Sequence, residues 1–312
     1  MNAFTDAASA PRASHTGPLA AFALLALVWG YNWVVMKVAM RYSGPIDFAV
    51  LRVASGVVLL FVLLLALGVP MKPRHVVKTA LIGFFQTAGF VGLISWSVAL
   101  GETGKAAVLA YTMPFWVILI GWPFLGERLR GWQWPAVALA LIGLLLVLEL
   151  GASGGLGGGS LASSLLALAA GASWGVSVVI VKKTPMQGRD ELLSLTAWQM
   201  LYGLVPLVAV ALVVPERPIE WSLPFIGAFV YNAVGGMAIG TLLWLYILQR
   251  LPATISGMSS LVVPVVGVAA AWLQLGERPS LAEGVGILLI LAALAVLIST
   301  SARPATPELR EA

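Results

Sequence analysis

The feature that most constrains this chain is a succession of apolar runs, each about twenty residues long, from one end of the sequence to the other. A helix of about twenty residues spans roughly 30 Å, which is the thickness of the hydrocarbon core of a bilayer. The runs do not alternate in polarity as barrel strands would, so helices are the only way to satisfy the backbone inside lipid. With 60% apolar residues and a mean hydropathy of +0.97, the sequence predicts an all-α polytopic membrane protein.

Apolar runs and helix breakers together predict ten transmembrane helices joined by short polar loops. The expected spans are 19–41, 47–69, 76–100, 104–124, 132–150, 161–183, 192–214, 222–249, 252–274 and 280–300. Residues 1–18 and 301–312 are expected to form polar cytoplasmic tails, the first of them disordered. The first 18 residues lack the basic start and cleavage site of a signal peptide, so we expect them in the mature chain.

Lysine and arginine indicate the orientation, because cytoplasmic loops carry an excess of them. With the N-terminus inside, twelve of the 18 basic residues lie in cytoplasmic loops and tails, five lie outside, and only Arg52 lies within a span. Both termini are therefore expected in the cytoplasm. The net charge of +5 does not indicate a nucleic-acid partner, because the basic residues lie in loops between spans. The chain has no cysteine and hence no disulfide chemistry.

The chain reads as two related halves, 19–150 and 161–300, separated by a flexible Gly/Ser-rich linker at 151–160. Motifs recur in the same order in each half. The matched positions are Trp29-Gly30 with Trp174-Gly175, Trp96 with Trp244, Pro114 with Pro264, and Gly-Glu-Arg at 126–128 with Gly-Glu-Arg at 276–278. Since five spans is an odd number, the second half begins on the opposite face of the membrane, which predicts an inverted repeat.

These features resemble the EamA family of the drug/metabolite transporter superfamily. The resemblance rests on five plus five spans, the Trp-Gly opening of each half, and the mid-span proline followed by Gly-Glu-Arg. The Trp-rich first and third spans are most similar to the YddG-type amino-acid exporters. The resemblance implies a multi-pass protein of the bacterial inner membrane that exports aromatic and other neutral amino acids. Membership in a fold does not fix the cargo, so exporters of other small metabolites or drugs, and a channel-like pore, stay as alternatives.

An inverted repeat forms its substrate site between the halves, near the middle of the membrane. Polar, aromatic and proline residues of spans one, three, four, six, eight and nine are expected to line it. These candidates are Trp29, Asn32, Gln86, Ser95, Tyr111, Pro114, Trp174, Ser177, Tyr231, Asn232, Ser260 and Pro264. Amides would bind a carboxylate, aromatic rings would contact the ammonium or the side chain, and the prolines would free carbonyls near Ala110 and Ser260.

Each candidate also has a structural explanation. Asn32 and Gln86 are as well suited to hydrogen bonds between helices, serine hydroxyls can bond their own backbone, and a proline alone is a kink. Gly30 and Gly175 are interpreted as close helix contacts. Interface anchors at the membrane surface are the favoured interpretation for seven further tryptophans, Trp33, Trp122, Trp132, Trp134, Trp198, Trp221 and Trp272.

The lack of acidic residues and histidine near the middle of the predicted spans narrows the possible transport mechanisms. No Asp, Glu or His lies near the middle of any predicted span, which favours facilitated diffusion over proton coupling. Arg52 is interpreted as a snorkelling or structural residue. The sequence has no metalloprotease or nucleophile-elbow motif, and Gly101–Ala106 does not match a phosphate loop, so we expect no enzyme activity, cofactor or metal. The expected partners are amino acids and the lipid bilayer, and the expected state is a monomer.

Overall fold

The computed structural model describes residues 16–126, 131, 133–148, 159–185, 188–240, 243, 247 and 253–301, some of them by backbone alone. Several sequence predictions therefore lie outside the described residues. These are both tails except for their innermost residues, linker residues 151–158, Trp132, Trp244, the first Glu127-Arg128 pair, and the side chain of Ser260.

Every regular element in the described part of the chain is helical. The elements, in order, are α1 Thr16–Ala39, α2 Pro45–Ala66, α3 Val76–Ile82, η1 Gly83–Gly89, α4 Phe90–Leu100, α5 Thr103–Ala110, α6 Met113–Leu125, α7 Gln133–Leu148, α8 Gly159–Lys182, α9 Arg189–Val213, α10 Leu223–Val230, η2 Tyr231–Ile239, α12 Ala253–Ala270, η3 Ala271–Leu275 and α13 Leu281–Ser301. The three η segments are π-helical and continue the α-helices that precede them.

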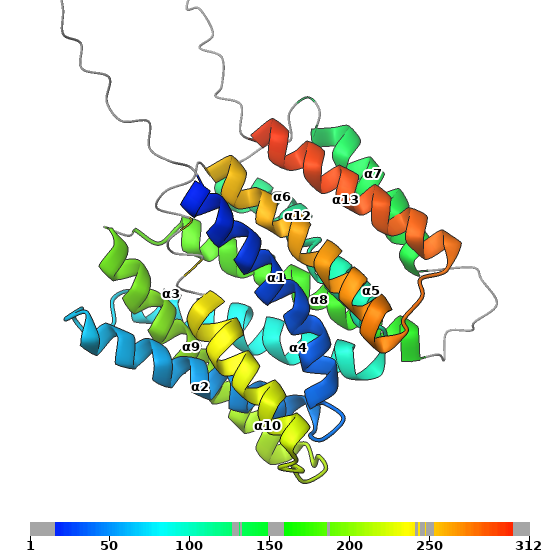
Figure 1. The fold of residues 1–312 in the computed structure, drawn as a ribbon. Helices are drawn as coiled ribbons and strands as arrows, with labels where there is room; N and C mark the ends of the chain where they lie inside the picture. The colour runs from blue at the N-terminus through cyan, green and yellow to red at the C-terminus, as the bar shows by residue number, and fades with distance from the viewer. Residues whose placement is uncertain are drawn as a thin grey trace, which may run out of the picture.

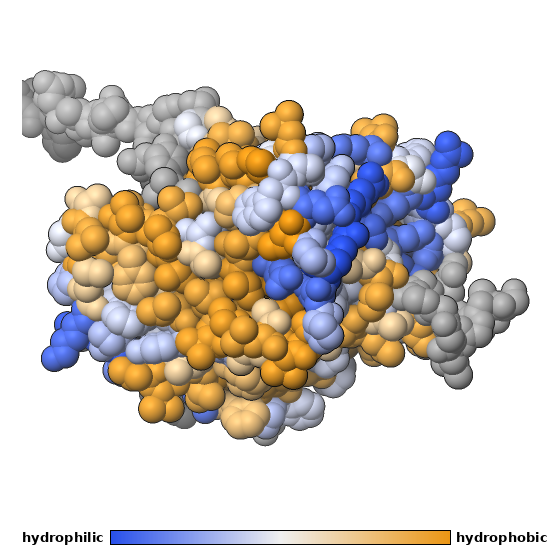
Figure 2. All heavy atoms as spheres, turned by 90° about the horizontal axis from the view of Figure 1, so that it is seen from below, coloured by the Kyte–Doolittle hydropathy of each residue, from blue (hydrophilic) through white to orange (hydrophobic). Residues whose placement is uncertain are grey.

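Six stretches of the described helices are long and apolar enough to cross a bilayer, and four shorter apolar helices accompany them. The long ones are Ala20–Ala39, Pro45–Ala66, Val76–Leu100, Thr103–Leu125, Leu161–Lys182 and Asp190–Val213; the shorter ones are Trp134–Val147, Leu223–Met237, Val262–Leu275 and Leu281–Val296. Apolar side chains cover much of the surface (Figure 2), and Leu212, Leu273 and Leu281 are more than four-fifths exposed. Lipid accommodates such a surface, whereas water does not. The all-α polytopic fold is confirmed.

The helices of the two halves pack in matched pairs. Helix α1 packs on α12, and its counterpart α8 packs on α5 and α6. A Cβ atom added at Gly30 would lie 2.5 Å from Cβ of Val266, and one added at Gly175 would lie 2.8 Å from Cβ of Trp116. Val266 and Trp116 each follow the matched proline of their half by two positions. The prediction that both glycines permit close helix packing is confirmed, at equivalent places in the two halves.

A second cross-half pair, α7 with α13, lies along one side of the bundle (Figure 1). The backbones approach closely at Gly143 and Gly286. A Cβ atom added at Gly286 would lie 2.6 Å from the carbonyl oxygen of Gly143, and one added at Gly143 would lie 2.7 Å from that of Gly286. Small residues allow this approach where helices meet inside a membrane. The fifth and tenth spans therefore pack with their backbones in close contact.

The two Gly-Glu-Arg motifs begin at opposite ends of the bundle. Gly126 ends α6 with φ 70°, and Gly276 ends η3 with φ 71°, a conformation that favours glycine. Gly126 follows Phe124, whose ring lies 5.7 Å from Nζ of Lys183, at the end that also holds loop 67–75. We call this the Arg74 end. Gly276 belongs to the opposite end, with loops 40–44, 101–102 and 214–222, which we call the Lys105 end. This inversion is what an odd number of spans per half requires.

The fourth span departs from the expected single helix over 104–124. The helix breaks at Tyr111 and Thr112, and Pro114 lies in the first turn of α6 rather than inside a helix. The Thr112 hydroxyl donates to the Leu109 carbonyl at 2.6 Å across the break. Proline lacks a backbone N–H and disfavours helix geometry at the preceding residue, so the chain leaves the helix before it. The matched Pro264 stays within α12, so the two prolines differ locally.

Candidate substrate site

A buried set of hydrogen bonds joins α1 to η2. The Asn232 amide donates from Nδ2 to Oδ1 of Asn32 at 2.7 Å. The indole of Trp29 donates from Nε1 to the Gly236 carbonyl at 3.0 Å, and the Tyr231 hydroxyl donates to the Val28 carbonyl at 3.0 Å. We call Trp29, Asn32, Tyr231 and Asn232 the α1–η2 seam. Four predicted site residues, two from each half, are therefore in direct contact between the halves.

Glycines of the eighth span make room for this seam. A Cβ atom added at Gly236 would lie 3.2 Å from Oδ1 of Asn32, and one added at Gly240 would lie 2.2 Å from Nε1 of Trp29. The segment between α10 and Gly240 is π-helical, and π-helical turns inside α-helices occur frequently at functional sites. The first half has its own π segment, η1, at the corresponding place in the third span. The third span of each half thus contains a π-helical segment where it contacts a neighbouring helix.

One polar atom of the seam has no partner. Asn232 is fully buried, its Nδ2 is bonded to Asn32, and its Oδ1 accepts no hydrogen bond from the described part of the chain. A buried amide oxygen without a donor costs free energy, so such an atom needs an explanation. An ammonium or hydroxyl group of a bound solute would satisfy it.

Two pairs of aromatic rings involve the seam or its neighbours on α1. Tyr31 and Tyr231 meet edge to face with ring centroids 5.6 Å apart, and Tyr111 lies 6.4 Å from Trp33. Trp33 is only 7% exposed, so its interpretation as an interface anchor was wrong. It follows Asn32 on α1 and packs inward against the break in the fourth span, a position that a belt of aromatic residues facing lipid does not have.

The other tryptophans fit the interface interpretation better. Trp122, Trp134, Trp221 and Trp272 are each more than half exposed. Trp198 is intermediate, since its indole donates to the Met71 carbonyl at 2.9 Å and its ring meets Phe61 edge to face at 5.2 Å.

The remaining predicted residues of spans three and six are Trp174, Ser177, Gln86 and Ser95. Trp174 meets Phe90 edge to face at 4.7 Å, and Ser173 donates to the Phe85 carbonyl at 2.7 Å, so α8 contacts the third span as α1 contacts the eighth. Ser177 donates to the Trp174 carbonyl in its own helix at 2.7 Å. Ser95 is buried, and its hydroxyl has no hydrogen-bond partner among the described residues. Gln86 is half-buried within η1.

The backbone carbonyls near the two prolines do not lie together in one group. Ala110 is buried, and its carbonyl oxygen lies 3.0 Å from where a Cβ of Gly171 would stand, so it faces α8. Pro264 is buried in α12, and the carbonyl of Val263 beside it faces Gly30. The structure therefore brings together Trp29, Asn32, Tyr231 and Asn232 directly, and it does not join the two prolines to them by any contact described.

Arg52 was missed as a functional candidate. It lies in α2, Nη1 donates to Sδ of Met36 at 2.9 Å, and Nε is buried without a partner in the described part of the chain. Met36 is one helical turn from Asn32 on α1. A single arginine within an apolar span was the signal available in the sequence, because ionisable residues inside membranes are costly and commonly functional.

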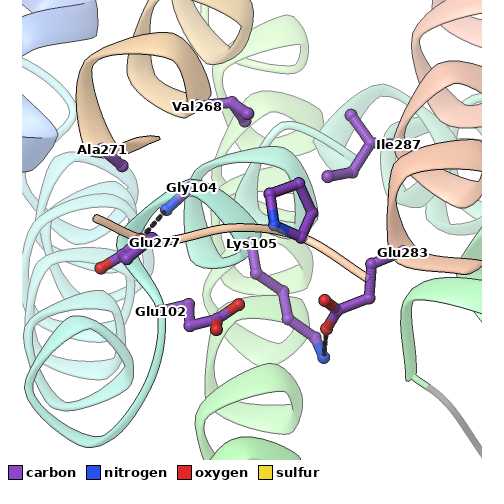
Figure 3. A pocket seen from close by; sticks show the side chains of 9 residues that line it. Glu102, Gly104, Lys105, Val268, Ala271, Glu277, Glu283 and Ile287 are labelled. Atoms are coloured by element: carbon purple, nitrogen blue, oxygen red, sulfur yellow. Dashed lines mark hydrogen bonds and ion pairs between the residues drawn. The ribbon is translucent and has the colours of Figure 1, made fainter. Parts of the chain in front are cut away.

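Charged residues close the Lys105 end across the two halves (Figure 3). Lys105 and Glu283 form an ion pair at 2.5 Å, with both side chains about nine-tenths buried. Glu277, from the second Gly-Glu-Arg, accepts the Gly104 backbone N–H at 3.0 Å and so caps the first turn of α5. A pocket lined by these residues and Glu102 lies between the fourth, ninth and tenth spans.

Local motifs fix this network. The Ser280 hydroxyl accepts the Glu283 N–H at 3.1 Å, and the Glu283 carboxylate accepts the Ser280 N–H at 3.0 Å. This is a capping box at the start of α13, and the Ser-Leu-Ala-Glu sequence could have predicted it. Loop 214–222 adds a further cap, because the Glu216 carboxylate accepts the N–H groups of Ile46 at 3.0 Å and Asp47 at 2.9 Å.

The Arg74 end is also joined across the halves. Arg74 and Glu191 form an ion pair, and the Lys78 ammonium donates to the Lys183 carbonyl at 2.7 Å. Within the described residues, no three His, Asp or Glu side chains come together to hold a metal ion. The site therefore consists of an amide and aromatic seam in the interior, with charged contacts at each end of the bundle.

Comparison with known proteins identifies the family to which this architecture belongs. The model of the EamA-like transporter family matches twice, over residues 16–149 and 161–299. A "Probable amino-acid metabolite efflux pump" of Salmonella typhimurium is 29% identical over 283 residues, covering 87% of this chain and 91% of its own. The protein of the same description in Escherichia coli K12 is 28% identical over 283 residues, with 87% and 91% covered.

Two further comparisons agree with these. The "Uncharacterized transporter YoaV" of Bacillus subtilis is 27% identical over 273 residues, covering 85% of this chain and 90% of its own. A crystal structure that is 21% identical superposes with a TM-score of 0.60 over 93% of this chain and 98% of that one, a likeness of fold alone. The two family matches coincide with the two inverted halves. The chain is a multi-pass membrane transporter and not an enzyme, and it belongs to the EamA-like transporter family.

Proposed function

We propose that this transporter exports amino acids, aromatic and other neutral ones, from the cytoplasm. The observation that carries the proposal is the α1–η2 seam, a pair of buried amides with an unpaired acceptor oxygen beside aromatic rings. Amides bind carboxylate and ammonium groups, and aromatic rings supply apolar area and cation–π contact. The two relatives described as probable amino-acid metabolite efflux pumps support the same class of solute.

We further propose that the halves work by alternating access. The seam lies between helices of different halves, and both ends of the bundle carry cross-half contacts that would break and form in turn. In the described spans, each Asp and Glu lies in the first turn of its helix, as Asp47, Glu191 and Glu283 do. This supports facilitated diffusion down a gradient rather than proton coupling.

Location and sidedness belong to the same proposal. The excess of Lys and Arg at the Arg74 end supports cytoplasmic termini, with the Lys105 end outside. A relative described as the "Uncharacterized inner membrane transporter YedA" supports the bacterial inner membrane. The protein would act as a monomer, since each half supplies two residues of the seam, with residues 151–160 as a tether.

Counterflow in proteoliposomes tests the function. Vesicles are loaded with a millimolar unlabelled amino acid, and entry of labelled amino acids from a panel is followed with and without a pH gradient. We expect saturable uptake that internal substrate accelerates and that the gradient leaves unchanged. Uptake of no member of the panel would refute amino-acid export. A current without acceleration by internal substrate would identify a channel instead.

A further inference from the structure

We propose that Arg52 binds the carboxylate of the substrate and that Oδ1 of Asn232 binds its ammonium group, with one turn of α1 between them. The inference rests on the proposed function and names the recognition that would select a zwitterion. It replaces the interpretation of Arg52 as a snorkelling or structural residue, because Arg52 brings a full positive charge into the interior.

The first observation concerns the place of Arg52. Helix α2 packs against α9, α4 and η2, whereas α1 packs against α12 and the eighth span. Arg52 extends from α2 as far as Met36 of α1, so its guanidinium group bridges these two helices. The side chain thus lies against the face of α1 that carries Asn32 and Met36, at positions four residues apart.

The second observation concerns the hydrogen bonds of the guanidinium group on this half-buried side chain. Its Nη1 donates to the sulfur of Met36, which is a weak acceptor, and its Nε is buried without any acceptor among the described residues. A cation held away from water costs free energy unless a paired anion compensates it. A bound carboxylate would supply two oxygens to the planar fork of the arginine, which a lysine cannot match.

The third observation is the complementary atom on the other side. Among the described residues, Oδ1 of Asn232 is a buried acceptor without a donor, just as Nε of Arg52 is a buried donor without an acceptor. An α-amino acid carries an anionic acceptor and a cationic donor on the same carbon atom. The two unpaired protein atoms therefore match the two ends of a zwitterion in hydrogen-bonding sense.

The two groups also lie near each other along α1. Arg52 contacts Met36 and Asn232 contacts Asn32, and these two residues of α1 are four positions apart, or about 6 Å along the helix axis. Solutes with only one of the two charged groups would leave one protein atom unpaired, which disfavours their binding.

The experiment compares three solutes in counterflow, namely phenylalanine, phenylalaninamide, which lacks the carboxylate, and 3-phenylpropanoate, which lacks the ammonium. The wild-type protein is expected to prefer phenylalanine by about tenfold or more in kcat/KM, since each missing group forfeits a charge-assisted hydrogen bond. Arg52→Gln is expected to raise KM for phenylalanine about tenfold and to leave transport of phenylalaninamide unchanged. Asn232→Leu is expected to remove the preference over 3-phenylpropanoate.

Controls separate recognition from folding and from net charge. Lys72→Gln removes an exposed cation of loop 67–75 at the Arg74 end and is expected to keep the wild-type preference. Arg52→Lys keeps the charge but loses the fork, so KM for phenylalanine should rise by less than in Arg52→Gln. If Arg52→Gln fails to fold, thermal stabilisation of detergent-solubilised Arg52→Lys by phenylalanine, reduced relative to wild type, provides the same test.

The outcomes distinguish the inference from the proposed function. If wild-type vesicles transport none of the three solutes and no other amino acid, amino-acid export itself is refuted. If they transport phenylalanine and Arg52→Gln discriminates among the three solutes as wild type does, the role of Arg52 is refuted while export stands. An equal loss for all three solutes in Arg52→Gln would show a purely structural arginine and would also overturn the inference.

Discussion

The buried asparagines of the first and eighth spans combine a packing contact with the proposed binding role. The Asn232 amide uses its donor to hold Asn32, which is the helix-to-helix contact that the sequence allowed for, and its acceptor oxygen has no partner among the described residues. A hydrogen bond of this kind contributes about 0.5–2 kcal/mol to helix association in a membrane. In the proposed function, this contact holds the seam in shape and the remaining oxygen binds the solute.

Tryptophan 174 and Gln86 are predicted to support transport. Trp174→Ala removes the edge-to-face contact with Phe90 and the aromatic wall of α8, and Gln86→Ala removes the half-buried amide of η1. We expect at least a tenfold lower rate of uptake by proteoliposomes for each variant, with protein still present in the membrane. Trp272→Ala is the matched control, because Trp272 is 56% exposed, and its uptake should equal that of wild type. Unchanged uptake by both test variants would show that these residues do not line the passage.

Glutamate 277 is predicted to act on stability. Glu277→Ala removes the carboxylate that caps Gly104 at the start of α5, and the loss of such a cap costs about 0.5–2 kcal/mol. The melting temperature of the detergent-solubilised protein should fall, while uptake per folded molecule stays near that of wild type. Glu220→Ala, at an exposed position of loop 214–222, is the comparison and should melt as wild type does. Lost uptake with an unchanged melting temperature would assign Glu277 to transport instead.

At the scale of elements, the helical spans could be predicted because their length and apolar composition follow directly from the thickness of a bilayer. The break at Tyr111 could not, because the same sequence signal, a proline inside an apolar run, gives a break at Pro114 and an unbroken helix at Pro264. The π-helical segments η1 and η2 were likewise not predicted, since π-helical turns have no distinct residue pattern within a span of continuous helix.

That the twelve candidate residues line a substrate site stays a prediction, made from residue type and place within the spans. The structure brings Trp29 and Asn32 of the first span against Asn232 of the eighth, and the matched motifs did not predict this pairing, because the counterpart of Trp29 is Trp174. Trp33 was misplaced because tryptophan is frequent both at interfaces and in packed interiors, and only tertiary contact with Tyr111 decides between them. Arg52 was set aside because the sequence does not show whether a charged side chain reaches lipid headgroups or another helix.

Alanine substitutions are expected to lower the stability of the protein at the two matched glycines and to raise it at an exposed glycine. Gly30→Ala and Gly175→Ala insert a methyl group within 2.5 Å of Val266 and 2.8 Å of Trp116, so each should destabilise the protein by about 1–3 kcal/mol. Gly227→Ala, in α10, meets nothing within 4 Å and should stabilise by up to about 1 kcal/mol through helix propensity. Melting temperatures of the three purified variants check this. Equal shifts at all three positions would mean that α1–α12 and α8–α6 contacts do not limit stability.

At the scale of the whole molecule, the inverted repeat explains why the two Gly-Glu-Arg motifs lie at opposite ends of the bundle. The second Gly-Glu-Arg caps α5 at the Lys105 end, while the first begins with Gly126 at the Arg74 end. Both ends are joined across the halves, by Lys105 with Glu283 and by Arg74 with Glu191. Under the proposed alternating access, such contacts would open in turn to let a solute pass, so the charged ends are the parts of the molecule that we expect to move.

The absence of cysteine makes the sidedness directly measurable. Arg278→Cys and Lys72→Cys place single thiols at exposed positions of the Lys105 end and the Arg74 end, respectively. In intact cells a membrane-impermeant maleimide is expected to label residue 278 and to spare residue 72 until the membrane is permeabilised. Labelling of both residues from outside would contradict the inverted arrangement, and labelling of residue 72 alone would reverse the proposed orientation.

The unequal partners of Gly30 and Gly175 have a consequence for the working cycle. Two identical inverted halves would make the inward-open and outward-open forms isoenergetic, since each half would simply exchange roles with the other. Here one crossing closes on a valine and the other on a tryptophan. Likewise, Gly203 of the seventh span meets the Gly83 backbone, whereas Gly56, at the corresponding position of the second span, meets methionine side chains. Under the proposed alternating access, packing alone breaks this degeneracy, and we expect the empty carrier to have a preferred resting side before any solute or gradient acts on it.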